Sequence, residues 1–172
     1  GLIELDNIGV EETDPISFAD VMPTSLVMAI ETAITAAGGT AEVLVDTVAL
    51  IPQQKSVSFD SFTSATLNSG YIDVKIINNL FIPLGAPIYV DIKNNIGTQI
   101  FQLTWDMEIA AGDSATAIQD VSGMSLPGSM LVEVSGTSNG SQGQQVAVTT
   151  ADMSSTFTVG LTAREFQVTQ AS

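Results

Sequence analysis

Asp106 and Glu108 are the two residues whose types and spacing come nearest to catalytic chemistry. Two carboxylates can serve as the acid and the base of a glycoside hydrolase, and these two stand two positions apart. Their neighbours alternate between apolar and polar residues, and the solvent-facing side of a half-buried strand carries polar residues for that reason alone. We therefore interpret the pair as part of the wet face of a strand and predict no hydrolase site there.

Lys55 lies beside two serines, Ser56 and Ser58, which raises the question of a Ser–Lys dyad. The chain has no S-x-x-K arrangement, the spacing that such dyads use. It also contains no histidine and no cysteine, which removes serine triads, Cys–His pairs, and imidazole or thiolate metal sites. We expect a lysine on an exposed strand or a sheet edge, no catalytic residue and no enzymatic activity.

Glu11, Glu12 and Asp14 form the densest acidic run of the chain. Calcium prefers clustered oxygen ligands, so calcium is the metal that the composition leaves open. The run matches no EF-hand pattern, the chain has no nucleotide-binding fingerprint, and a solvated acidic segment explains the three residues as well. The sequence therefore predicts no cofactor-binding or metal-ligating residue, with calcium binding as the one open alternative.

The charge of the chain restricts its partners. Four cations, Lys55, Lys75, Lys93 and Arg164, stand against nineteen carboxylates, which gives a formal net charge of −15. Nucleic acid is excluded as a partner because its binding depends on Lys and Arg neutralising phosphates. The longest apolar run, residues 26–30, is far too short to span a bilayer, so no transmembrane segment is expected. Salt screens the charge, and ordered self-association stays open.

The clearest secondary-structure signal is strict alternation over residues 101–109. A period of two indicates a strand with one buried face, and that face would carry Phe101, Leu103, Trp105, Met107 and Ile109. Residues 88–93 alternate in the same way, and Asn94 to Gly97 between the two runs supply turn residues. We predict a β-hairpin, with Trp105 in the core.

The same pattern predicts further strands at residues 42–50, 56–67, 71–80, 129–136, 144–150 and 155–169. Turn signals separate them, among them Asn68-Ser69-Gly70. The apolar parity changes within the last strand, so a bulge is expected near residues 163–165. Eight or nine short strands with regular turns predict an all-β fold, an antiparallel β-sandwich of the Greek-key or jelly-roll type.

Two segments fall outside this strand pattern. Residues 24–37 place Leu26, Ile30 and Ile34 on one face between Pro23 and Gly38, which predicts one short helix against an end or an edge of the sheets. Residues 1–20 are acidic without a cation and could form a terminal strand or arm. We predict a single β-sandwich domain over residues 1–172.

These features favour a non-enzymatic, extracellular structural or interaction protein. Only 13% of the residues are charged, and a surface of uncharged polar residues without cysteine is typical of secreted or cell-surface β proteins of prokaryotic or viral origin. Both ends of the chain read as strands, so we hypothesise a subunit of a filament, surface layer or adhesive appendage that self-associates through terminal strands. The alternative is a secreted binding module for an apolar or carbohydrate ligand, with a cavity beside the helix.

Overall fold

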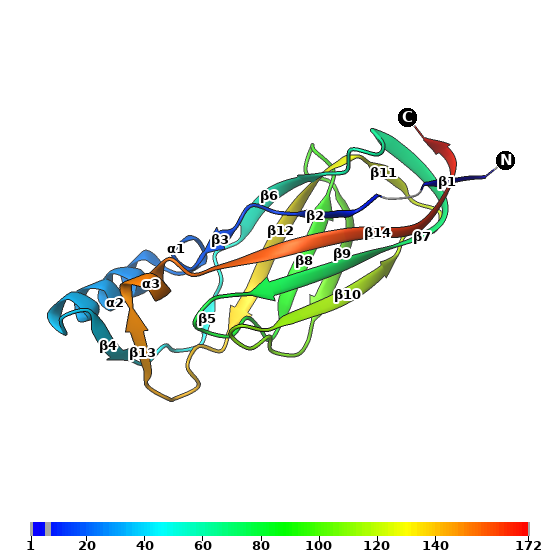
Figure 1. Cartoon of the computed structure of the whole chain (residues 1–172). Coiled ribbons are helices and arrows are strands. Elements are labelled where there is room, and N and C mark those ends of the chain that lie inside the picture. Colours follow the sequence, from blue (N-terminus) through cyan, green and yellow to red (C-terminus); the bar gives the residue numbers. More distant parts are fainter. Residues whose placement is uncertain (1, 6–7, 172) are drawn as a thin grey trace.

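The fold is an all-β antiparallel sandwich with a small helical end. The computed structural model describes residues 2–5 and 8–171. Strands make up 54% of the structure and helices 13%. Figure 1 shows an elongated molecule in which two sheets face each other, the helices gather at one end, and the two ends of the chain lie at the other. The prediction of an antiparallel β-sandwich is confirmed.

The first sheet has four strand positions, and every neighbouring pair in it is antiparallel. One edge consists of three short N-terminal strands, each of which pairs with a different part of β14. The other side of β14 pairs with β7, and the far side of β7 pairs with β10 and β11. In that order the strands are β1 (Ile3–Leu5), β2 (Val10–Glu12), β3 (Ile16–Ser17), β14 (Thr156–Ala171), β7 (Ser64–Asn78), β10 (Ser114–Asp120) and β11 (Ser125–Pro127). The acidic N-terminal segment is thus an edge strand of the protein's own sheet. The C-terminal strand β14 is paired on both sides, so the expectation that both terminal strands are available to another copy is wrong for the C-terminal one.

The second sheet lies across the core from the first. Its central strand β12 pairs with β5 and β6 on one side and with β8 on the other, and β9 lies beyond β8. The strands are β5 (Val48–Ala49), β6 (Gln53–Ser58), β12 (Ser129–Ser138), β8 (Ile88–Lys93) and β9 (Gln99–Trp105). The hairpin predicted from alternation is the β8–β9 pair.

The strand order identifies a jelly roll. Consecutive short strands that share one position in a sheet can be counted as one strand, and the sandwich then has eight positions numbered along the chain. Their order is 1-8-3-6 in the first sheet and 2-7-4-5 in the second. This interleaving of two four-stranded sheets is the double Greek key of a jelly roll. The expected number of eight or nine strands agrees with the number of positions, although the strand expected at 144–150 is β13, outside the sandwich. Interruptions within the positions and the separate β4–β13 pair bring the number of named strands to fourteen.

The helical end is built from the two connections that leave the sandwich there (Figure 1). It contains α1 (Phe18–Val21), α2 (Thr24–Ala36), β4 (Thr40–Val43), β13 (Val146–Thr149) and α3 (Thr150–Met153). β4 and β13 form a separate two-stranded sheet, against which α2 packs. The predicted helix at 24–37 is confirmed: Val27, Ile30 and Ile34 are buried, and Gly38 follows with φ +81°, a conformation that suits glycine at a helix end.

Two local expectations are wrong, and the reason in each case is tertiary. β9 ends at Trp105, so Met107 lies in the following loop and is 82% exposed, although Trp105 itself is buried as predicted. The expected turn at residues 68–70 lies in the middle of β7. There Gly70 passes against Phe166, and a Cβ on Gly70 would stand 2.6 Å from the Phe166 ring, so the glycine serves close packing.

Other boundaries also differ. The interruption expected at residues 68–70 falls instead between β6 and β7, at 59–63, and the strand expected at 42–50 is divided into β4 and β5. The bulge is confirmed: the β14–β7 register shifts after Arg164, and Glu165 has φ +57°. β10 was not predicted, because Ala115 and Ala117 give its inner face little hydrophobic contrast.

Candidate interaction surfaces

The structure brings the predicted chemical residues into no catalytic arrangement. Asp106 and Glu108 lie beyond the end of β9, and both are exposed. The Glu108 carboxylate accepts hydrogen bonds from Asn139 Nδ2 at 3.1 Å and from Gln142 Nε2 at 2.6 Å. Glu108 therefore anchors the loop that follows β12, a structural role.

Lys55 and its neighbouring serines lie on β6. Successive side chains of a strand point to opposite faces, so Lys55 and Ser56 are turned away from each other. Ser58 is hydrogen-bonded to Ser129, with 3.0 Å between the hydroxyl oxygens. Lys55 is half-buried on the same side of β6 as Val57, and among the described strands β6 pairs with β12 alone, so the lysine lies on an edge strand and is not fully exposed.

The acidic run at the N-terminus is spread along an extended strand. Glu11 and Glu12 are consecutive residues of β2 and face opposite sides, and Asp14 lies beyond its end. Residues 2–5 and 8–171 contain no group of three or more acidic side chains that could hold a metal ion. The described part of the chain also contains no helix that is long and apolar enough to cross a membrane.

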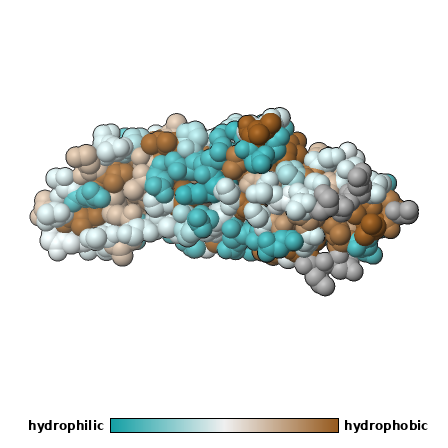
Figure 2. Space-filling view, turned by 90° about the horizontal axis from the view of Figure 1, so that it is seen from above, coloured by the Kyte–Doolittle hydropathy of each residue, from teal (hydrophilic) through white to brown (hydrophobic). Residues whose placement is uncertain are grey.

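The two edges of the first sheet differ in charge. Glu4, Glu12 and Asp14 are exposed on the N-terminal edge, and Glu11 is half-buried there. β10, at the opposite edge, has the sequence Ser-Ala-Thr-Ala-Ile-Gln before Asp120 and exposes Ile118. In the view from above, Figure 2 shows the most hydrophilic residues over the middle of the molecule, with hydrophobic residues scattered among them and at both ends.

The two edges also run in opposite directions. The three successive strand pairings of this sheet are all antiparallel, and three reversals leave the N-terminal edge antiparallel to β10. Neither edge pairs with a further strand within the described ranges. Such edges present free N–H and C=O groups that can pair with another chain.

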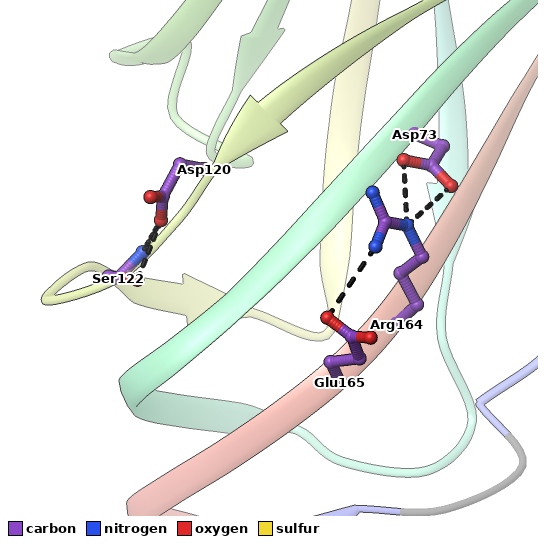
Figure 3. Close-up of polar contacts among 5 residues, drawn as sticks. All are labelled: Asp73, Asp120, Ser122, Arg164 and Glu165. Carbon is purple, nitrogen blue, oxygen red and sulfur yellow. Dashed lines mark hydrogen bonds and ion pairs between the residues drawn. The ribbon is translucent and has the colours of Figure 1, made fainter.

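Arg164 organises the outer face of this sheet near its bulge. Its Nε donates to both carboxylate oxygens of Asp73, at 3.0 and 2.8 Å, and its guanidinium carbon lies 4.6 Å from the centre of the Tyr71 ring. Figure 3 shows the guanidinium between Asp73 on β7 and Glu165 on β14. The hydrogen bond to Asp73 raises the pKa of Arg164 above its ordinary value. The cluster holds β7 and β14 in register.

Asp120 ends β10 and turns the chain towards β11. Its carboxylate accepts hydrogen bonds from the Ser122 hydroxyl at 2.6 Å and from the Ser122 amide at 2.9 Å (Figure 3). These two bonds, the one from the hydroxyl first, lower the pKa of Asp120 below its ordinary value. The turn that ends the β10 edge is thus tied by a charged residue.

The chain has no match among protein-family models or curated proteins. Solved structures of similar shape include a family 35 carbohydrate-binding module from an environmental isolate, with 10% identity, a TM-score of 0.32 and coverage of 98% of this chain and 96% of that one. A CBM4 structure gives 12% identity and a TM-score of 0.30, covering 76% and 81%.

Two larger proteins are also matched over part of their length. The VP2 subviral particle of infectious bursal disease virus gives 14% identity and a TM-score of 0.34, covering 91% of this chain and 32% of VP2. The MgGH51 α-L-arabinofuranosidase gives 8% identity and a TM-score of 0.34, and this chain spans 23% of its length. No functional residue is carried over from any of these proteins.

Proposed function

We propose that the protein is a non-enzymatic extracellular structural or interaction protein, the subunit of a filament, surface layer or adhesive appendage joined by strand pairing. The observation that carries the proposal is that the first sheet ends in two unpaired edges of opposite direction and different charge. The lack of histidine and cysteine supports the non-enzymatic part of the proposal, because it removes most catalytic mechanisms.

Strand direction determines how two copies could meet. If one copy is shifted sideways by the width of the sheet, its β10 comes to lie beside the N-terminal edge of the next copy. The two strands are then antiparallel, as every pair within the sheet is. A head-to-tail contact of this kind leaves the same two edges free at the ends of the array, so it can propagate into a filament.

Charge favours this contact over the symmetric one. Two N-terminal edges placed side by side would bring Glu4, Glu12 and Asp14 of both copies together, and facing like charges destabilise strand pairs. β10 carries no charge before Asp120. β10, whose one charged residue is the terminal Asp120, is therefore the better partner for the acidic edge, and the assembly has a direction.

The test is the length of particles seen by negative-stain microscopy at about 0.15 M salt, an ionic strength at which the net charge is screened beyond about 8 Å. The native protein should form polymers. Ile118→Asp adds a carboxylate to an exposed position of β10 and should leave the protein folded but monomeric. Ala147→Asp, at an exposed site on β13 in the separate two-stranded sheet, is the control and should polymerise. Native protein that stays monomeric at every concentration, or Ile118→Asp protein that polymerises normally, would contradict the proposal.

The surface beside α2 does not favour the alternative of a binding module. The depression next to α2 is open to solvent and is lined by Met28, Glu31, Thr32, Thr35 and Ala36. Met28 is the one large apolar side chain among them. A different surface, the outer face of the first sheet, favours a binding role.

A further inference from the structure

A groove crosses the outer face of the first sheet above Gly160. It has a volume of about 410 Å³ and is lined by Val10, Glu12, Lys75, Ile77, Gly160 and Thr162. These residues come from β2, β14 and β7, three neighbouring strands. Gly160 is on the middle strand and has no side chain, so it forms the floor of the groove between the side chains of the two flanking strands.

Strand register places opposite charges on the two sides of this gap. Gly160 is directly opposite Glu12 on β2 and directly opposite Lys75 on β7. With strands about 4.8 Å apart, the backbones of Glu12 and Lys75 are roughly 10 Å from each other. Among residues 2–5 and 8–171 neither side chain has an ion-pair partner, whereas Lys93 and Arg164 are both paired.

Glu12 and Lys75 therefore keep their hydrogen-bonding capacity for a third group. The carboxylate of Glu12 accepts and the ammonium of Lys75 donates, while the hydroxyl of Thr162 can do both. Val10 and Ile77 add apolar surface at opposite ends of the groove. A ligand that fits must offer donors, acceptors and apolar C–H groups together.

Charge narrows the class of ligand. An anion would meet Glu12 and the field of a protein with a net charge of −15, and a cation would meet the ammonium of Lys75. A neutral polyhydroxylated molecule satisfies both ends of the groove, because each hydroxyl is both a donor and an acceptor. Its C–H faces can pack against Val10 and Ile77.

The same face continues along the strands to the Arg164 cluster. Gly160 and Arg164 are four positions apart on β14, which corresponds to roughly 13 Å of strand. Arg164 holds Asp73 and Tyr71 in place there, as Figure 3 shows for Asp73. A polar and partly aromatic surface thus extends from the groove in the direction of the strands, which suits an extended chain.

We propose that the Gly160 groove binds a neutral oligosaccharide or polysaccharide chain, held between Glu12 and Lys75. The site is formed within one copy of the protein and does not depend on assembly. It would add a ligand to the strand-pairing role proposed above, as a surface subunit that also adheres to glycans.

Gly160→Val is the decisive variant. A Cβ at position 160 would meet Glu12 Cγ at 3.5 Å and Val10 Cγ1 at 3.7 Å, which are ordinary contacts. A β-branched residue suits a strand, so the variant should fold while its side chain occupies the floor of the groove between Glu12 and Lys75 and blocks close approach of a ligand. Lys75→Met removes the donor, and Ser135→Val on the outer face of the second sheet is the matched control.

The measurement is affinity gel electrophoresis of monomeric size-exclusion fractions in gels containing xylan, mannan, a mixed-linkage β-glucan or, as the anionic arm, polygalacturonate. At least one neutral polysaccharide should retard the native protein and the Ser135→Val control equally. Gly160→Val should abolish retardation, and Lys75→Met should weaken binding by about tenfold to a hundredfold, the effect of losing a charged hydrogen bond.

Retardation by none of the neutral polymers, retardation by polygalacturonate alone, or unchanged retardation of Gly160→Val would overturn the proposal. Circular dichroism of each variant separates loss of binding from loss of fold. Because the fractions are monomeric, a failure to bind leaves the microscopy test of strand pairing unaffected.

Discussion

Asn78 ends β7 in the core, and its replacement by alanine should be among the most destabilising single changes in the protein. The side chain is fully buried. Its Nδ2 lies 3.1 Å from the Ile82 oxygen, 3.0 Å from the Ile109 oxygen and 3.3 Å from the Ala110 oxygen, and its Oδ1 accepts the Leu80 amide at 3.0 Å. One amide therefore joins the end of β7 to two loops.

The magnitude follows from the donors available. The NH₂ group has two hydrogens for its three carbonyl partners, so the side chain supplies about three full hydrogen bonds, counting the one that Oδ1 accepts. At about 1 kcal/mol each, with a further penalty for buried groups left unsatisfied, Asn78→Ala should lower the free energy of unfolding by about 3–5 kcal/mol. Asn78→Asp should cost more, because a carboxylate would face three carbonyl oxygens.

The assay is urea unfolding followed by tryptophan fluorescence, since the one tryptophan, Trp105, is buried in the same sandwich. With a slope of about 2 kcal/mol per molar urea, the midpoint should fall by about 2 M. Asn79→Ala is the matched control: Asn79 is exposed, and its midpoint should stay within about 0.3 M of native. A loss below about 1 kcal/mol for Asn78→Ala would refute the reasoning.

Three further outcomes are expected. Gly140→Ala should lower the free energy of unfolding by about 2–4 kcal/mol in the same assay, because Gly140 has φ +63° and an added Cβ would overlap the Val45 carbonyl oxygen. Gly143→Ala should cost less, because a Cβ added there meets no atom within 4 Å. In a ¹³C NMR titration the carboxyl of Asp120 should titrate below its ordinary pKa, and Ser122→Ala should raise the pKa of Asp120. The stability that the Ser122 hydrogen bonds contribute is present above the pKa of Asp120 in the unfolded state, and it is lost as pH falls through the lowered pKa of the folded state. Deleting residues 2–10, which removes β1 and the start of β2, should abolish polymers, and truncated protein that still polymerises would contradict the role of these residues in the contact.

The sequence by itself determined the local elements. Strict alternation in residues 88–93 and 101–105 predicted the β8–β9 hairpin, because a strand that is buried on one side must alternate. The spacing of Ile30 and Ile34 between Pro23 and Gly38 predicted α2, and the change of parity in β14 predicted its bulge. These features depend on residues close in the chain, so their signal survives without a structure.

Tertiary structure alone decided which strands meet, and with them the candidate surfaces. The signals that misled came from residues whose partners are distant: Met107 leaves the sheet because the chain must cross to β10, and Gly70 accommodates Phe166 from β14. The four-position sheet makes β10 and the N-terminal segment its edges. The groove likewise needs Glu12, Lys75 and Gly160, which are far apart in sequence and become neighbours through strand register. Register is set by packing over the whole sandwich, so no local pattern encodes it.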